Sequence, residues 1–432
     1  MGSGFNFFLN AINKTPSTTG SFVDVDCSGD IPSGTTGVIL KINNTDASGQ
    51  RAEVRKNGSS DNFGLYIGGS AGRYALVGVD TNRIFEAYIA TTNTKIYLIG
   101  YADENCGFFD NAVNKTPSTV GSWQDVDCSG DIPSDATGVI CLLYNTSGST
   151  NYSAGIRKNG SSDEFTYAAI YQSARFSYQL CGVDADRIFE AKTQNAAAKV
   201  YLIGYTKSPI TFFDNGIDKS LTTTGSWTDI DVTSETDPLA DGAIILIKNT
   251  HASTQHRSDV RENGSSDNHS PMLLFYGSCA AGLCGLDTDQ IFEGYIADLT
   301  VDFYVIGYCK PAVGVTDKGF SDVGGGADAF LNPYRAMPFT DTGHGAEAFN
   351  TPFRSMGFAD VGHGVDLFTL LRMLAFFDTG NGADAFIKWI VGAIENIRSE
   401  LVTLAGEKGV HNLQGNKGVL ALQGEKGEVE LD

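Results

Sequence analysis

Histidine is the side chain best suited to acid–base chemistry near neutral pH. The chain has six, all beyond residue 250: His251, His256, His269, His344, His363 and His411. No Ser-His-Asp arrangement, nucleophile elbow or phosphate-binding loop recurs in the sequence. Paired carboxylates such as Asp24 and Asp26 alternate with apolar residues, which places them on the solvent face of a strand. We therefore predict a protein that is not an enzyme.

The eight cysteines offer no metal-binding or redox motif, because no C-x-x-C or Cys/His spacing occurs. Cys27 and Cys128 hold equivalent places in an internal repeat, and Val232 takes that place in the third copy. A thiol that interchanges with valine is most simply a small buried hydrophobic group. A local disulfide between Cys279 and Cys284 is the alternative that remains open.

Acidic residues recur in a second motif near the C-terminus, F-x-D-x-G-x-G-x-[DE]-x-F, found four times at a spacing of eighteen or nineteen residues. Carboxylates around a glycine turn could coordinate Ca²⁺, which takes oxygen ligands. They could instead cap turns and face water, and we favour this structural role because the spacing matches neither an EF-hand loop nor the nine-residue calcium β-roll. The candidate calcium ligands are Asp322, Asp328, Asp341, Glu347, Asp360, Asp366, Asp378 and Asp384.

Aromatic side chains that stack on sugars are the remaining candidates for binding. The second repeat has four in the stretch where the three copies differ most, as expected of surface loops: Tyr167, Tyr171, Phe176 and Tyr178. Alternation along a strand could bury half of them. They are the predicted contact for a glycan or receptor.

The elements that must position these residues come from a unit of about one hundred residues that recurs three times. Each copy opens with a Phe-Phe pair, as in FFLNAINKTPSTTGSF, and continues through a TGVI-like strand, the turn NGSSD and a closing YLIGY-like strand. We place the copies at residues 1–106, 107–209 and 210–311 and call them repeats 1, 2 and 3.

Within one repeat, short runs of Val, Ile, Tyr and Phe alternate with polar residues and end at turn signals every eight to twelve residues. Seven or eight strands per repeat favour a jelly-roll-like β-sandwich over an open sheet. Asn-Gly turns at Asn57, Asn159 and Asn263 are expected to supply positive φ angles. Arg55, for example, is expected to pair with Glu86 across strands, and the same pairing is expected in the other repeats.

Residues 312–386 hold the F-x-D motif, which predicts one small supersecondary unit per copy with Phe residues packing between neighbours. Residues 383–404 carry an apolar stripe at three-and-four spacing that predicts an amphipathic helix. Residues 405–432 repeat every nine residues with L-x-G-x-K-G, which predicts a β-ribbon. We assign assembly to the apolar residues of this tail: Phe386, Trp389, Ile390, Ile394, Ile397, Leu401, Leu404, Leu413, Leu422 and Leu431. The predicted fold class is all-β, with this single helix.

The formal net charge of −21 disfavours binding to nucleic acid or to anionic membranes. No apolar run is long enough to span a bilayer, so membrane insertion is not expected. The N-terminus lacks the basic and apolar segments of a secretory signal, so we expect either release from the cytoplasm by assembly or lysis, or a signal that has been removed. No cofactor is required by any motif, and Ca²⁺ is the one candidate ion.

The unit that runs from G-S-W-x-D-I-D through T-G-V-I, R-K-N-G-S-S-D, V-G-V-D-x-x-R-I-F-E-A and Y-L-I-G-Y resembles β-sandwich repeats of virion proteins from tailed bacterial and archaeal viruses. The resemblance covers residues 7–311 and carries over no site residue. It implies a homo-oligomeric tail-fibre or capsid-surface protein on the virion exterior, a trimer being one candidate. Its implied partners are copies of itself, other virion proteins and a host-surface glycan or protein. A cellular filament or adhesin at the cell surface is the alternative.

Overall fold

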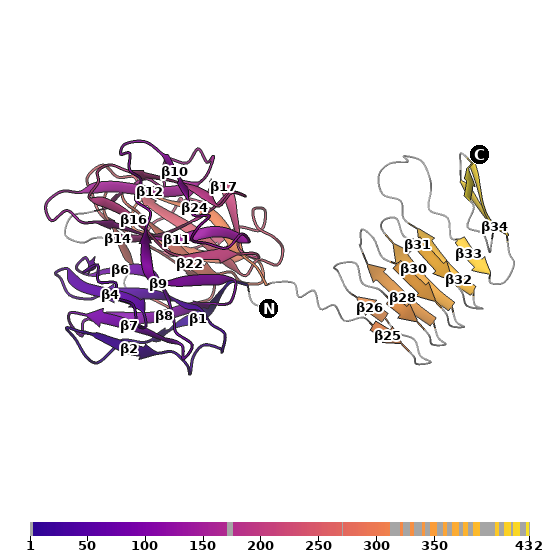
Figure 1. Cartoon of the computed structure of the whole chain (residues 1–432), viewed down its shortest axis with the longest axis horizontal. Coiled ribbons are helices and arrows are strands. Elements are labelled where there is room, and N and C mark those ends of the chain that lie inside the picture. Colours follow the sequence, from indigo (N-terminus) through magenta and orange to yellow (C-terminus); the bar gives the residue numbers. More distant parts are fainter. Residues whose placement is uncertain are drawn as a thin grey trace. The chain divides into compact units, whose positions relative to one another are not determined.

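In the computed structural model, the chain divides into two compact units, Met1–Ala312 and Val313–Asp432 (Figure 1). The structure describes residues 3–170, 176–269 and 271–311 of the first unit and, in the second, the strands listed below. Among the described residues, none belongs to a helix that is both long and apolar enough to span a membrane.

Repeat 1 is a sandwich of two four-stranded antiparallel sheets. The first sheet has the order β1-β8-β3-β6 and the second the order β2-β7-β4-β5. This alternation of two sheets along one chain is the jelly-roll topology. The strands are β1 (Phe5–Asn13), β2 (Phe22–Asp26), β3 (Gly37–Asn44), β4 (Gln50–Lys56), β5 (Tyr66–Ile67), β6 (Ala71–Gly78), β7 (Ile84–Ile89) and β8 (Thr94–Ala102).

Repeat 2 has the same topology, with sheets β9-β16-β11-β14 and β10-β15-β12-β13. Its strands are β9 (Cys106–Asn114), β10 (Gln124–Asp127), β11 (Ala136–Asn145), β12 (Tyr152–Lys158), β13 (Ala168–Ile170), β14 (Phe176–Gly182), β15 (Ile188–Thr193) and β16 (Ala198–Lys207).

Repeat 3 completes the series with the sheet β17-β24-β19-β22 and the strands β18-β23-β20-β21; β21 also pairs with β6, so these four strands and the first sheet of repeat 1 form one eight-stranded sheet. Its strands are β17 (Thr211–Asp218), β18 (Trp227–Asp231), β19 (Gly242–Asn249), β20 (His256–Glu262), β21 (Met272–Leu274), β22 (Cys279–Gly285), β23 (Ile291–Ile296) and β24 (Val301–Cys309). The prediction of three tandem jelly-roll sandwiches is confirmed by these strand orders.

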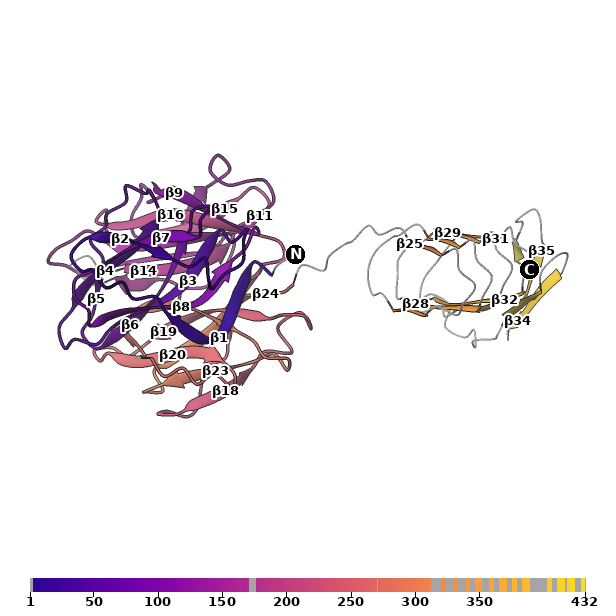
Figure 2. The same ribbon diagram turned by 90° about the horizontal axis from the view of Figure 1, so that it is seen from below.

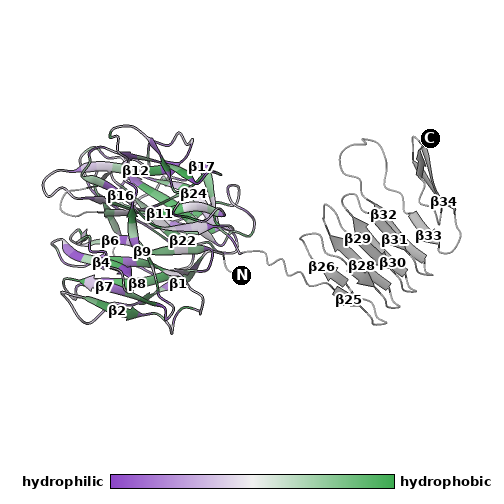
Figure 3. Ribbon diagram, in the orientation of Figure 1, coloured by the Kyte–Doolittle hydropathy of each residue, from purple (hydrophilic) through white to green (hydrophobic). Residues whose placement is uncertain are grey.

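The burial pattern explains why the sequence forms these layers. Along β7 and β8, buried residues alternate with partly exposed ones, as expected of a sheet with one face in the core. Every residue of β3 is buried, because this strand is covered on both faces. One apolar cluster joins all three repeats, including Leu40, Leu142 and Leu246 from equivalent strands. Figure 3 shows these apolar strands surrounded by more hydrophilic loops.

Several local predictions are confirmed. Arg55 Nε donates to Glu86 Oε2 at 2.8 Å, and Arg157–Glu190 and Arg261–Glu293 pair in the same way in repeats 2 and 3. Gly58, Gly160 and Gly264 of the Asn-Gly turns have φ angles of 81°, 78° and 80°. All eight cysteines are free and buried, so the alternative of a Cys279–Cys284 disulfide is wrong; both residues lie on β22.

The second unit contains two sheets of parallel strands, with one strand of each sheet contributed by each F-x-D copy (Figure 2). The first sheet comprises β25 (Phe320–Asp322), β27 (Phe339–Asp341), β29 (Gly357–Asp360) and β31 (Ala375–Asp378). The second comprises β26 (Ala329–Leu331), β28 (Ala346–Thr351), β30 (Val365–Leu370) and β32 (Ala383–Lys388), with β33 (Val402–Ala405) added antiparallel. Equivalent residues stand in register, for example Phe320 beside Phe339 and Phe339 beside Phe358.

The helix predicted over residues 383–404 is wrong at both ends. Ala383–Lys388 is strand β32, with Phe386 paired to Phe368 of the preceding copy, and Val402–Ala405 is strand β33. In-register pairing with the neighbouring copy overrides the local apolar periodicity. Residues 389–401 lie outside the described residues. The predicted C-terminal ribbon is present as the antiparallel strands β34 (Val410–Gly415), β35 (Gly418–Gln423) and β36 (Val429–Leu431).

Candidate assembly site: the seams between the repeats

The NGSSD turn of repeat 1 forms hydrogen bonds with β9, the first strand of repeat 2. Asn111 Oδ1 accepts hydrogen bonds from the Ser60 backbone N–H at 2.8 Å and from the Ser59 and Ser60 hydroxyls at 3.1 and 2.9 Å. The Ala112 N–H donates to Asp61 Oδ2 at 2.8 Å. One turn therefore satisfies both a side chain and a backbone group of the next repeat.

A break in strand pairing makes this contact possible. The register of β9 against β16 shifts between the pairs Phe108–Gly204 and Val113–Leu202, which indicates a bulge between them. The intervening backbone, including the Ala112 N–H, is thereby directed away from its own sheet. The same register shift occurs between Phe7 and Ile12 of β1 and between Phe212 and Ile217 of β17.

We call each interface between two repeats a seam: the first joins repeats 1 and 2, the second joins repeats 2 and 3, and the third joins repeats 3 and 1. The same contact recurs at the second and third seams. Asn215 Oδ1 accepts from the Ser162 N–H at 2.8 Å, and the Gly216 N–H donates to Asp163 Oδ2 at 2.8 Å. The turn of repeat 3 returns to repeat 1. There Asn10 Oδ1 accepts from the Ser266 N–H at 2.9 Å, and the Ala11 N–H donates to Asp267 Oδ2 at 2.8 Å.

Three head-to-tail contacts of one kind thus close a ring of three repeats, with approximate threefold symmetry. At its centre, the equivalent strands β6, β14 and β22 contact one another.

A phenylalanine of each repeat packs against glycines of the preceding one. A Cβ atom on Gly37 would lie 2.2 Å from the Phe108 ring, and one on Gly138 would lie 2.3 Å from the Phe212 ring. Phe7 stands in the same relation to Gly242, at 2.4 Å. These distances are far below a normal carbon–carbon contact, so the ring fits only because these positions lack a side chain.

A contact between aromatic rings is the third contact at every seam, tilted by 51° at the first and stacked at the other two. The Phe63 ring lies 4.9 Å from the Tyr201 ring, and Phe165 stacks on Tyr304 at 3.8 Å with the planes 6° apart. At the third seam His269 takes the place of phenylalanine and stacks on Tyr97 at 3.7 Å and 20°.

Ion pairs distinguish the seams further. Lys56 pairs with Asp110 at 2.7 Å and Lys158 with Asp214 at 2.6 Å, both aspartates being largely exposed. Repeat 3 has Glu262 at the lysine position, and repeat 1 has Leu9 at the aspartate position, so no equivalent pair forms there.

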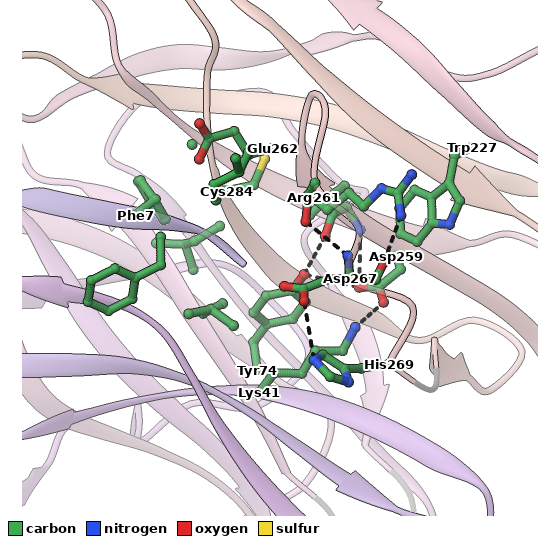
Figure 4. Close-up of a pocket in the computed structure, with 17 residues that line it drawn as sticks. Phe7, Lys41, Tyr74, Trp227, Asp259, Arg261, Glu262, Asp267, His269 and Cys284 are labelled. Atoms are coloured by element: carbon green, nitrogen blue, oxygen red, sulfur yellow. Dashed lines mark hydrogen bonds and ion pairs between the residues drawn. The ribbon is translucent and has the colours of Figure 1, made fainter. Parts of the chain in front are cut away.

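The third seam instead contains a buried polar cluster (Figure 4). Lys41 of β3 forms an ion pair with Asp259 of β20, with side-chain exposures of 7% and 1%. The Tyr74 hydroxyl lies 3.0 Å from Asp259 Oδ1 and 2.9 Å from the Val260 carbonyl oxygen. At the equivalent positions stand Leu246 and Gly155 in the seam between repeats 2 and 3, and Leu142 and Glu53 in the seam between repeats 1 and 2, where the buried Glu53 pairs with Arg51 of its own strand. A parallel pairing of Met272 with Gly72 joins β21 to β6 beside the cluster.

Burial governs the titration of this cluster. It raises the pKa of Asp259, although the adjacent Lys41 ammonium acts in the opposite direction. Burial likewise raises the pKa of Tyr74 well above its ordinary value, and the neighbouring Asp259 carboxylate adds to the effect. Burial and then the Asp287 charge raise the pKa of Glu262.

The predicted aromatic contact residues occupy different environments. Phe176 and Tyr178 are 6% and 5% exposed, so neither is available to a surface ligand, and both belong to the shared core. Tyr167 is half-buried, with its ring edge against Trp123 and the Lys192 ammonium over its face. Tyr171 lies outside the described residues. The alternation of β14 is lost because repeats cover both of its faces.

The predicted calcium ligands lie in the second unit. The backbones of Asp322, Asp341, Asp360 and Asp378 form one row across parallel strands, and Glu347 pairs with Asp366 in the facing sheet. Asp384 is in β32, and Asp328 lies outside the described residues. Calcium binding stays a prediction.

The predicted assembly residues are only partly described. Phe386 and Leu404 lie in β32 and β33, whereas Leu413, Leu422 and Leu431 lie in the three ribbon strands. Trp389, Ile390, Ile394, Ile397 and Leu401 lie outside the described residues. Their assignment to assembly stays a prediction.

The seams are not apparent from the sequence, because a local turn is a sufficient explanation of the NGSSD motif. A signal was available: Asn10, Asn111 and Asn215 hold the same place, two residues after a Phe-Phe pair, in all three repeats. An asparagine that recurs beside a Phe-Phe pair, together with a recurring Ser-Ser-Asp, indicates two halves of one contact.

Comparison with known proteins gives little guidance. No family model matches the chain, and no curated protein does. Among solved structures, it is similar to a chain from the atomic structure of Sulfolobus turreted icosahedral virus, with 10% identity and a TM-score of 0.19 over 71% of this chain and 91% of that one. A chain from the triple jelly roll fold and turret assembly of an archaeal virus is 11% identical, with a TM-score of 0.19 over 72% and 90%. Because both TM-scores are low, the fold assignment rests on the strand order alone.

Proposed function

We propose that this chain is a non-enzymatic structural protein of a virion exterior, either a tail fibre or a capsid-surface component. The observation that carries the proposal is the closed ring of three jelly rolls. Its most distinctive polar motifs, Asn-Gly-Ser-Ser-Asp and Phe-Phe-x-Asn, are used to hold one repeat to the next. Such a ring is a rigid block that presents loops, which suits a scaffold.

The second unit supports self-assembly as the other half of this function. Its parallel strands place each copy of the motif in register with the next, and its ribbon ends in the edge strand β36. Short edge strands bury little area alone and are stabilised by pairing with another chain. We infer that the full chain forms a homo-oligomer, for which a trimer is one candidate, and that the ring contacts a host surface.

Light scattering after size exclusion tests the assembly role on the full chain and on a chain that ends at residue 382. We expect an oligomer for the first and a monomer for the second, with the same exchange protection in residues 3–311 of both. Equal masses would remove the assembly role from the tail.

Immunogold labelling of intact particles with antibodies to the ring tests the location. Label on the particle surface supports the proposal, whereas label confined to cell envelopes or extracellular filaments supports the adhesin instead. Turnover of a substrate by the purified protein would contradict the non-enzymatic assignment.

A further inference from the structure

The seam between repeats 3 and 1 differs from the others in how it is held. Chain connections join repeat 1 to repeat 2 after β8 and repeat 2 to repeat 3 after β16. Repeats 3 and 1 are not consecutive, so their seam closes through noncovalent contacts. Separation of these two repeats would open the ring without breaking the chain.

This seam carries His269 where the other two carry Phe63 and Phe165. The His269 side chain is 23% exposed, and its ring lies against that of Tyr97 from β8. Its Nε2 atom is 3.4 Å from Asp267 Oδ1 of the same turn. Figure 4 shows His269 beside Lys41 and Asp267 at the cavity between the two repeats.

The charged and titratable groups around His269 come from every neighbouring element. Asp267 lies on its own turn, Asp259 on β20, Lys41 on β3 and Tyr97 on β8. The cavity wall adds the side chains of Tyr74, Arg261, Glu262 and Cys284. The two aspartates favour an imidazolium, whereas Lys41 and burial oppose it.

Burial is the dominant influence and lowers the pKa of His269. A histidine whose pKa is lower in the closed seam than in the open one binds a proton more readily after opening. Protonation therefore favours the open seam, beginning as the pH falls through the ordinary histidine value of about 6.5.

We propose that the seam between repeats 3 and 1 is an acid-sensitive latch, in which protonation of His269 loosens its stacking on Tyr97 and opens the ring at that seam. Phe63 and Phe165 cannot take up a proton, so the matching seams stay closed over the same pH range. The latch depends on the ring itself and not on the proposed location in a virion.

The nearby carboxyl groups have the opposite effect. The pKa values of Asp259 and Glu262 are raised in the closed state, so their protonation favours closure as the pH falls. The contribution of His269 is therefore measured as a difference between two proteins that share these carboxyls. His269→Phe is the matched variant, because phenylalanine already fits this place in two seams.

Hydrogen exchange of the full chain measures the opening. Peptides that cover β6 and β21 report on this seam, because their backbones pair across it, and peptides that cover β12 serve as an internal reference. Rates are corrected for intrinsic exchange at pH 7.5, 6.5 and 5.5. The opening constant of the wild type relative to His269→Phe is expected to rise by up to about tenfold between pH 7.5 and 5.5.

A second variant, Phe165→His, tests the idea at a seam that the natural chain keeps apolar. It should introduce acid-dependent exchange between repeats 2 and 3 and leave that between repeats 3 and 1 unchanged. A ratio of wild type to His269→Phe that stays constant or falls with decreasing pH would overturn the proposal. Acid-induced exchange spread equally over all three seams in the wild type would overturn it as well.

Discussion

Removal of either member of the Lys41–Asp259 pair is expected to destabilise the ring severely. The two side chains are 7% and 1% exposed, so a single substitution leaves the other charge buried without its partner. Loss of one partner of a buried ion pair costs about 3–5 kcal/mol. We expect this range for Lys41→Leu, because Leu142 and Leu246 show that leucine fits the equivalent positions.

The double substitution should be much milder than either single one. With Asp259→Ala added, neither charge remains, and Tyr74 keeps its hydrogen bond to the Val260 carbonyl. Replacement of a buried ion pair by apolar residues is often close to neutral. We therefore expect the Lys41→Leu/Asp259→Ala protein to recover at least about 2 kcal/mol relative to Lys41→Leu, a coupling that a double-mutant cycle isolates.

Denaturant unfolding followed by tryptophan fluorescence is a suitable assay, because Trp123 and Trp227 report on repeats 2 and 3. Exchange protection at β6 and β21 checks that the loss is located at the seam. Lys95→Leu, in the partly exposed part of β8, is the control and should change stability by less than about 0.5 kcal/mol. Single substitutions that cost under about 1 kcal/mol, or a strictly additive double, would refute the reasoning.

Two further predictions address other contacts. Gly138→Ala, at the seam between repeats 2 and 3, should lower the free energy of unfolding by about 1–3 kcal/mol, because its Cβ would lie 2.3 Å from Phe212. Gly148→Ala is the control, because a Cβ there would have no atom within 4 Å. Equal melting temperatures of the two variants would contradict the expectation. Burial raises the pKa of Asp241 to about 6, so this residue contributes stability that is present in acid and lost as the pH rises through about 6. Asp241→Asn should weaken the dependence of stability on pH and stabilise the protein at pH 7 by about 1–2 kcal/mol after allowance for solvent screening. Denaturant unfolding curves at pH 5 and 7 that match those of the wild type would contradict this.

The jelly-roll sandwiches were predictable, because each strand's pattern and turn residues are local properties of the sequence. The Arg55–Glu86 pair was predictable for the same reason, since β4 and β7 are neighbours in any such sandwich. The helix prediction over 383–404 failed because apolar spacing alone does not record pairing with the preceding copy of a repeat. Phe386 takes its conformation from Phe368, eighteen residues earlier.

The seams were not predictable from one repeat, because their two halves lie far apart in the chain. Ser60 and Asn111 are 51 positions apart, and Asn10 and Ser266 are 256 apart. A turn motif and a strand motif each have a sufficient local explanation. Only the closure of the ring shows that the Asn-Gly-Ser-Ser-Asp turn is shaped for a partner.

Fusion of the three repeats into one chain makes a specialised seam possible. In a ring of three identical subunits, each subunit would carry both a lysine equivalent to Lys41 and an aspartate equivalent to Asp259. Such a pair would then be buried at every interface, three in all. In this chain, the equivalent positions are Leu246 and Gly155 at the seam between repeats 2 and 3, and Leu142 and Glu53 at the seam between repeats 1 and 2. Glu53 is buried too, but it pairs with Arg51 of its own strand. Among these equivalent positions, a buried pair of opposite charges that joins two repeats therefore occurs at one seam. The seam that carries it is the one without a chain connection. A ring that must open at a defined place needs this asymmetry, because three equal seams would give no preference among them.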